Sequence, residues 1–514
     1  MSNALRKSIS SSFNMSGYYL RSEAVDYLVE QFKDIDDRDQ REEWIEKLCD
    51  HIGRQNTLQP FLELEDIKSA VDACCKHVQQ SSQPLVEVVS AFDVPKFDFN
   101  IDLKKFFPTR SETHPLLAPP ETCTKFYTER FLMLKQRTMR HHLFKSGQQF
   151  QVQPIEVLLS SSQKIKHVVI LGMLTTMKDG RYQLEDPTGS IPISLTGVKY
   201  HTGFFTDNCF VLAEGNYKDE IFHVDSIGFP PTETAEMSRT VFGGSNIFGG
   251  LPETSLHNYE SLKAMEMSNP DSMIIFLSEV WLDRKEVMER LNRLFEGYSE
   301  VPPAIIVMMG NFLSTEMGTK HTLILKSHLK ELANLIGNYP SLIESTKFVF
   351  VPGPTDSFMG NILPRPPLSK TVTEYFSQKV PNSVFTTSPC RLRYCTQEIV
   401  LMREDIIIRL CRNSLHAPDI SDIPQHFVKT IVSQAFLMPL PITLCPVYWA
   451  HETALRLYPL PDLIVMADSF QPYTVKNTGC IVTNPSSFSN GNYAFKVYIP
   501  SSREVNDSQI PEET

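Results

Sequence analysis

The sequence predicts a multidomain protein of the α+β class, and three observations support this. Its 514 residues exceed what one hydrophobic core supports, since a domain averages roughly 150 residues. Hydrophobic residues make up 41% of the chain against 21% charged, which is enough apolar material for packed cores over most of its length. The hydrophobic period also changes along the chain, from helical spacing to short β-type runs and then to alternating strands and helices. We therefore expect about three or four structural units.

The overall charge argues against a protein that coats nucleic acid. The chain has 49 Lys and Arg against 60 Asp and Glu, a formal net charge of −11. Its surface as a whole repels phosphate, so any contact with DNA is expected to be indirect or weak. Apolar runs such as 304–309 fall well short of the ~20 residues that a membrane span needs. The ten cysteines are scattered without a C-x-x-C pair, which is typical of a reducing compartment, the cytoplasm or nucleus.

Residues 1–78 are expected to form a helical bundle, because apolar residues recur there at helical spacing. Ser22 is placed to cap the first amphipathic window. The outer face is acidic, which favours either simple solvation or a protein partner over DNA. The apolar windows are Val25, Leu28, Val29 and Phe32; Trp44, Ile45, Leu48 and Ile52; and Ile67, Val71, Cys74 and Val78.

Residues 79–123 are expected to be a linker, because prolines interrupt any long helix and no period persists. The stretch that follows, TKFYTERFLMLKQRTMRHHLFK at 124–145, is basic and predicts a helix with one apolar face. Two interpretations of its charges stay open. They contact an acidic partner or anion, or they lie in solvent while the apolar face packs on a neighbouring domain.

A small β-barrel is expected next, so that residues 124–230 form one unit with the basic helix. The runs HVVILGML, RYQLE, SIPISL, CFVLAEG and EIFHVDSI are β-type, and turn residues such as Asp179-Gly180 separate them. Five short strands with tight turns favour a barrel of the OB type. Such barrels often bind single strands through a basic groove. Residues 151–230 carry six Lys and Arg against nine Asp and Glu, which favours docking of a protein.

The remaining chain divides into a connector at 231–270, an α/β domain at 271–500 and a polar tail at 501–514. The connector carries Gly-Gly twice and several prolines. In the α/β domain, strands such as MIIFLS and AIIVMM alternate with amphipathic helices, as in a sheet covered by helices. The tail has too little apolar surface to order itself, so it is expected to be disordered.

Four loops at the ends of the α/β strands are where an active site is expected. They are SEVWLD at 278–283, GNF at 310–312, VPGPTD at 351–356 and the end of PDLIVMADSFQPY at 461–473. In frame and spacing they resemble the metal-binding motifs of calcineurin-like phosphoesterases, whose binuclear site activates a water to attack phosphorus. The resemblance implies that the metal-ligand positions have been substituted, and every imidazole is missing. These positions are Glu279, Trp281, Asn311, Pro354, Thr355, Asp468 and Phe470.

The substituted positions lead us to expect no metal, no cofactor and no catalytic residue. Trp281, Phe470 and Pro354 offer a divalent cation no useful ligand. The two aromatic side chains either fill a vacated pocket or anchor a partner.

Two other metal sites are conceivable from the sequence. A weak all-oxygen Mg²⁺ site could collect Glu279, Asp283, Asp356 and Asp468. Asp283 with Glu286 also matches a capping pair for the following helix, which is a structural reason for that carboxylate. A zinc site could be imagined from Cys390, Cys395, Cys411 and Cys445, but their spacing is irregular and buried thiols are favoured.

Longer strings extend the resemblance to the B-subunit family of eukaryotic replicative DNA polymerases, and within it to the epsilon type. They include RYQLEDPTGSIPISL, FVFVPGPTD, VFTTSPCRLRYCTQEIV with its continuation REDI, and CPVYWAHETALRLYPLPDLIVMAD, and they span most of residues 124–500. The N-terminal bundle is more loosely similar to the helical C-terminal domain of AAA+ ATPases.

This second resemblance implies a non-catalytic scaffold that acts in chromosomal replication in the nucleus. Barrel and inactive phosphoesterase domain would grip the cysteine-rich C-terminal domain of the catalytic polymerase subunit, and the N-terminal domain would link the polymerase to the replicative helicase assembly. The alternative is a diverged metal-dependent phosphoesterase or nuclease with a nonstandard carboxylate site.

Overall fold

The structure of the chain is a computed structural model that divides into two compact units, residues 1–84 and 85–514. No helix in the part of the chain described below is long and apolar enough to cross a membrane. The structure describes residues 2–15, 18–31, 45, 48, 61–62, 64, 67–68, 70–71, 86–109, 115–145, 150–242, 245–250, 256–315, 318, 320–356 and 361–511.

In the first unit, two helices contribute to an apolar core. These are α1 (Ser2–Met15) and α2 (Ser22–Gln31), and the short strands β1 (Tyr19–Leu20) and β2 (Phe61–Leu62) pair in parallel. The core collects Ile9, Phe13, Leu28, Ile45, Leu48, Ile67 and Val71. The predicted apolar positions therefore point inward wherever they are described, while Phe32, Trp44, Ile52, Cys74 and Val78 lie outside the described residues. The complete bundle and its likeness to AAA+ proteins stay predictions.

The predicted barrel is present in the second unit. Its strands pair in the order β10-β6-β7-β8-β11-β9, and an additional ladder between β10 and β11 closes the sheet on itself. The predicted turn at Asp186 also joins the barrel to a short helix, because its carboxylate accepts hydrogen bonds from the N–H groups of Thr188, Gly189 and Ile155. The elements are α6 (Ile155–Leu159), β6 (Ile165–Thr176), β7 (Tyr182–Asp186), β8 (Gly189–Ser194), β9 (Lys199–Tyr200), β10 (Phe210–Lys218) and β11 (Ile221–Gly228).

The α/β domain is built on two six-stranded sheets. One has the order β15-β14-β13-β12-β21-β22, with four parallel strands from β15 to β12. The other has the order β19-β20-β18-β17-β16-β3. The first sheet is made of β12 (Ile274–Ser278), β13 (Ile305–Met309), β14 (Lys347–Val351), β15 (Ser383–Phe385), β21 (Ala494–Ile499) and β22 (Glu504–Gln509), and the second of β3 (Val86–Ser90), β16 (Cys390–Tyr394), β17 (Gln397–Arg403), β18 (Leu463–Ala467), β19 (Tyr473–Asn477) and β20 (Cys480–Asn484).

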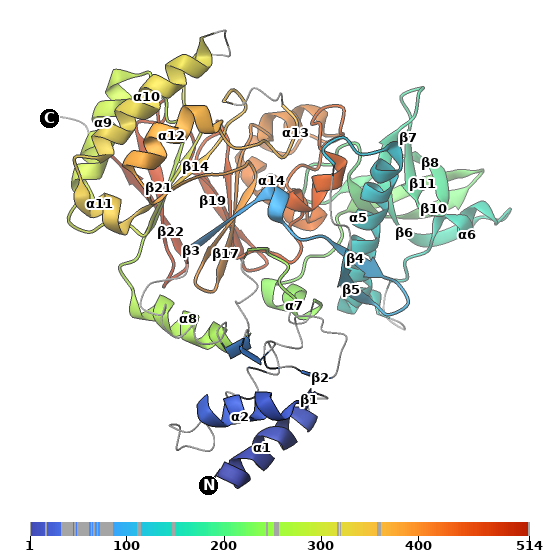
Figure 1. The fold of residues 1–514 in the computed structure, drawn as a ribbon. Coiled ribbons are helices and arrows are strands. Elements are labelled where there is room, and N and C mark those ends of the chain that lie inside the picture. The colour runs from blue at the N-terminus through green and yellow to red at the C-terminus, as the bar shows by residue number, and fades with distance from the viewer. Residues whose placement is uncertain are drawn as a thin grey trace. The chain divides into compact units, whose positions relative to one another are not determined.

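The two sheets pack face to face, and helices cover their outer faces. One core cluster joins Phe276 and Val307 of the first sheet to Leu401 and Val465 of the second. The central strands β12, β13 and β18 are apolar on both faces because each sheet is covered there on both sides. In Figure 1 the barrel lies at one end of this unit and the helices α9–α12 lie at the other. The outer helices are α9 (Lys285–Gly297), α10 (His321–Ile336), α11 (Pro340–Ser345) and α12 (Lys370–Lys379) beside the first sheet, and α13 (Ile407–Asn413) and α14 (Ile423–Gln434) beside the second.

Three segments that were expected to lack order are built into the second unit. The predicted linker supplies β3, which pairs with β16, and the hairpin β4 (Phe97–Asn100) and β5 (Lys105–Pro108). The connector contains α7 (Ala235–Thr240) and α8 (Leu256–Ser268), with Glu266 of α8 buried against Gln397. The tail forms β22, an edge strand that pairs with β21. These expectations were wrong because backbone pairing with another strand, rather than an apolar period of their own, orders β3 and β22.

The predicted basic helix is α5 (Pro120–Arg140), but two of its charges are not in solvent. Arg130 is 2% exposed, with its guanidinium carbon 4.2 Å from the ring centre of Phe436 and 5.2 Å from that of Phe210. Arg137 is 3% exposed and donates to the carbonyl oxygens of Val432 and Ser433. The helix therefore packs between the barrel and the second sheet, and its basic residues are partly internal.

Candidate functional site

The predicted site lies where the carboxyl ends of strands from both sheets meet. β12, β13 and β14 of the first sheet lead into the loops that hold Glu279, Asn311 and Thr355, and β18 of the second leads into Asp468. The structure brings the two edges together through Arg403, the last residue of β17.

Glu279 and Trp281 follow β12. The Glu279 backbone has a φ of 50°, an uncommon conformation for a residue with a side chain. Its carboxylate accepts a hydrogen bond from Nη2 of Arg403 at 2.7 Å. Trp281 is partly exposed, and its N–H donates to Oγ of Ser489 at 3.0 Å. Glu279 thus has a cationic partner within the protein.

The loops after β13 and β14 are held by hydrogen bonds from backbone N–H groups to side-chain oxygens. Oδ1 of Asn311 accepts from the N–H of Thr355 at 3.0 Å, and Pro354 beside it has no side-chain donor or acceptor. Asp356 is 2% exposed and accepts from the N–H groups of Phe312 at 2.9 Å and Gly353 at 2.8 Å. Burial raises the pKa of Asp356, although these two hydrogen bonds oppose the rise. These side chains stabilise loops.

The loop after β18 is closed in the same way. Asp468 accepts from the N–H groups of Ile406 at 2.7 Å, Ile407 at 3.0 Å and Phe470 at 2.8 Å. Burial raises its pKa against these hydrogen bonds. Phe470 is partly buried and packs against the core on the helical side of the second sheet. The carboxylate therefore fixes backbone, and the aromatic ring fills space.

Arg403 and Asp405 are the residues of the site that the motif comparison missed. The Arg403 side chain is fully buried, and Nη1 lies 2.8 Å from Oδ1 of Asp405. Nε donates to the carbonyl oxygen of Gly310 at 2.7 Å, and Nη1 donates to that of Ala467 at 3.3 Å. The sequence signal that could have identified them is the charged triplet Arg403-Glu404-Asp405, which directly follows the apolar run IVLM. We call Glu279, Arg403, Asp405 and the carbonyls of Gly310 and Ala467 the carboxyl-edge cluster.

The two alternative metal sites are not assembled. Within the described part of the chain, no three His, Cys, Asp or Glu side chains are placed to hold a metal ion. Asp283 lies apart, accepting from the N–H of Ser314 at 2.8 Å and its Oγ at 2.6 Å, so the predicted capping role was wrong and it ties two loops together. Cys390 and Cys395 lie between the sheets, whereas Cys445 lies in the core on the helical side. Burial raises the pKa of the Cys390 and Cys445 thiols to about 12.

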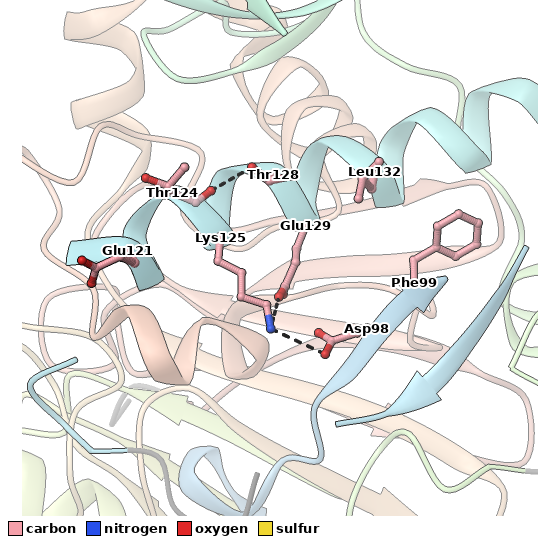
Figure 2. A pocket seen from close by; sticks show the side chains of 8 residues that line it. All are labelled: Asp98, Phe99, Glu121, Thr124, Lys125, Thr128, Glu129 and Leu132. Carbon is pink, nitrogen blue, oxygen red and sulfur yellow. Dashed lines mark hydrogen bonds and ion pairs between the residues drawn. The ribbon is translucent and has the colours of Figure 1, made fainter. Parts of the chain in front are cut away.

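A separate hollow of about 620 Å³ lies between α5 and the β4–β5 hairpin. Figure 2 shows Lys125 reaching between Glu129 of the same helix and Asp98 of β4, at 3.3 Å and 3.6 Å. Its lining mixes carboxylates, threonines and apolar side chains, with neither a His nor a Cys among the residues that line it. None of its lining residues belongs to the predicted site.

Comparison with known proteins covers nearly the whole chain. Three family models match it, described as DNA polymerases epsilon N terminal, DNA polymerase epsilon subunit 2-like OB-fold domain, and the B-subunit of DNA polymerase alpha/epsilon. They match residues 1–74, 120–231 and 274–476, respectively. The chain is 44% identical to DNA polymerase epsilon subunit 2 of Bos taurus and to that of Homo sapiens, with 98% of both chains covered in each case. It is 39% identical to the protein of the same name from Drosophila melanogaster, over 99% of this chain and 98% of that one.

The second of these models coincides with α5 and the closed barrel, and the third with the strands that carry the carboxyl-edge cluster. Both the sequence and the architecture thus agree with one assignment. The chain belongs to the DNA polymerase epsilon subunit 2 family.

Proposed function

We propose that this chain is the non-catalytic scaffold subunit of a nuclear DNA polymerase epsilon, and that its second unit binds the cysteine-rich C-terminal domain of the catalytic subunit. Family membership supports a role in a replicative polymerase. One observation supports a role without chemistry of its own. At the carboxyl ends of these strands, where a phosphoesterase would need open coordination positions, Glu279 is paired with the buried Arg403, and Asp356 and Asp468 accept hydrogen bonds from backbone N–H groups.

We further propose that the first unit links the polymerase to the replicative helicase assembly. The apolar core of this unit is separate from the cores of the second, since the two units divide at residues 84 and 85. A unit with its own core can carry a second partner independently of the first. Contact of the chain with DNA is then indirect or weak, consistent with its net charge of −11.

Co-purification tests the scaffold proposal. We expect the full-length chain to hold the C-terminal domain of the catalytic subunit through size-exclusion chromatography. Removal of residues 1–84 should leave that complex intact and abolish association with helicase components. Loss of the catalytic-subunit complex on this truncation, or failure of the full chain to form it, would contradict the proposal.

Metal analysis with a phosphodiester hydrolysis assay tests the non-catalytic part. We expect no stoichiometric metal and no turnover above background. Stoichiometric metal together with turnover abolished by Asp468→Ala would establish the alternative, a diverged phosphoesterase or nuclease. Direct single-strand binding by the barrel predicts a steep salt dependence, and we expect a flat titration at low salt instead.

A further inference from the structure

The guanidinium of Arg403 is surrounded by oxygen atoms from several different loops. Glu279 Oε1 lies 2.7 Å from Nη2, Asp405 Oδ1 2.8 Å from Nη1, and the carbonyl oxygen of Gly310 2.7 Å from Nε. Two longer contacts complete the set, Asp405 Oδ2 at 3.3 Å from Nη2 and the Ala467 carbonyl oxygen at 3.3 Å from Nη1. Arginine is the side chain suited to such a place, since its five donors have a fixed planar geometry.

Two carboxylates and two main-chain carbonyls are also the ligands that hard divalent cations prefer. In this protein the positive charge among them is covalently attached to β17. The Arg403 side chain is 0% exposed and the Glu279 side chain 10%, so bulk water screens their charges little. Unpaired carboxylates in such a place would be strongly destabilising.

We propose that Arg403 is the tethered cation of this site, and that it takes the place of a divalent metal among the oxygens of the carboxyl-edge cluster and keeps such ions out. The inference deepens the proposed function and rests on it, because it supplies the reason why the site would need no metal. Arg403 joins the first sheet to the second with one charge that no chelator or competing ion can remove.

The electrostatics agree with this placement. Burial opposes the charge on Arg403, but Asp405, Glu279 and Asp468 outweigh it and raise the pKa of the guanidinium above its ordinary value. Burial likewise opposes ionisation of Asp405, and Arg403 reverses that effect and lowers the pKa of this carboxyl. Arg403 and Asp405 therefore stabilise each other's charged form.

A side chain that merely filled space would behave differently, and three variants of the full-length chain separate the two roles. Arg403→Met removes the charge and keeps the bulk. R403M/E279Q/D405N also removes the negative charges. The control is Arg391→Met, because Arg391 is a buried arginine held by four main-chain carbonyls, those of Ile247, Phe248, Thr453 and Arg456. The probe is Mn²⁺ at millimolar concentration, followed by thermal unfolding and by the electron paramagnetic resonance signal of free Mn²⁺.

We expect Arg403→Met to lower the unfolding midpoint by about 5 °C or more. Mn²⁺ should raise the thermal unfolding midpoint of R403M, and R403M should reduce the electron paramagnetic resonance signal of free Mn²⁺. Neither effect is expected with the wild type or with R391M. The triple variant should be more stable than R403M and should not respond to Mn²⁺. These results together support a tethered cation.

Three results would overturn the inference. They are a triple variant that is less stable than R403M, an R403M protein that ignores Mn²⁺, and a wild-type protein that binds Mn²⁺ at this cluster. Should R403M not fold, the triple variant decides, because it folds if the arginine neutralises carboxylates and fails if the arginine is needed for packing. If the wild type neither binds metal nor hydrolyses phosphodiesters, and R403M does not respond to Mn²⁺, only this inference is contradicted. Metal-dependent hydrolysis by the wild type would also contradict the proposed function.

Discussion

At the scale of single residues, the chain buries charges wherever a second group fixes them. Arg456 is 8% exposed and pairs with Glu129 and Glu452. Arg365 is 1% exposed and pairs with Glu404. A buried pair of this kind need not stabilise the fold relative to apolar residues, but removal of one partner costs several kcal/mol. Such pairs therefore fix which loops lie together more than they raise stability.

Asp405 offers a pH-dependent test of these pairings. Its pKa is lowered in the folded protein, because Arg403 outweighs the effect of burial. A carboxyl with a lowered folded pKa stabilises the fold above its ordinary pKa of 3.8, and that contribution is lost as the pH falls through the lowered value. Asp405→Asn should therefore cost about 1 kcal/mol near neutral pH, after allowance for the partial exposure of the side chain.

The measurement is urea unfolding of the wild type and the variant from neutral pH downward. We expect the gap between the two midpoints to close as the medium becomes acidic. Glu504→Gln, on the exposed face of β22, is the control and should leave the midpoint unchanged. A gap that stays constant with pH would show that Asp405 does not stabilise the fold through its charge.

At the scale of secondary-structure elements, local pattern predicted what has local causes. The five barrel runs became β6, β7, β8, β10 and β11, because alternating apolar residues and turn residues determine strands directly. β3 could not be predicted, because its partner β16 lies far away in the sequence. β22 could not be predicted, because the apolar residues of its hairpin belong to β21 and β22 itself is polar. The short strand β9 was missed for the same reason.

The element β3 gives a test by truncation. Removal of residues 1–84 leaves every strand of the second unit in place. The second unit of the shortened chain should therefore unfold at the same temperature as it does in the full-length chain. Removal of residues 1–95 deletes β3 and Val89, which is 3% exposed, and leaves an open edge on β16. We expect this second truncation to unfold several degrees lower in calorimetry or to aggregate. Equal midpoints would show that β3 contributes little.

The location of the site's loops could also be predicted from local sequence pattern, but the partner of its carboxylates could not. Loops at the carboxyl ends of strands were identified from the motifs that follow Ser278, Gly310 and Gly353. Arg403 was not predicted as part of the site, because a comparison with metal-binding motifs looks for ligands and not for a cation supplied by the chain. Its contact with Glu279 joins the two sheets across 124 positions of sequence, and only the fold shows such a pairing.

At the scale of the whole second unit, one glutamine couples the barrel to the α/β domain. Gln434, the last residue of α14, is fully buried. Its Oε1 accepts from the N–H of Phe210 at 2.9 Å, and its Nε2 donates to the carbonyl oxygen of the same residue at 2.7 Å. The side-chain amide thus pairs with β10 as another strand would.

Gln434→Ala should uncouple the two parts. It leaves a buried N–H and a buried carbonyl of Phe210 unsatisfied, which costs about 2–4 kcal/mol. Because the loss falls at the boundary, we expect a single calorimetric transition to broaden or to split into two. Gln425→Ala, at an exposed position of the same helix, is the matched control and should behave as the wild type. A variant that keeps one sharp transition would show that other contacts carry the coupling.

The position of β3 beside β16 also determines when β3 can pair during synthesis of the chain. The hydrogen bond between the N–H of Ala91 and Oγ1 of Thr387 spans 296 residues. At ~5–20 residues per second, a ribosome needs on the order of 15 to 60 s to produce the second partner after the first. During that interval the nascent strand has no native neighbour, and the second sheet cannot reach its full width. The segment that becomes β3 therefore stays unpaired until most of the polypeptide has emerged.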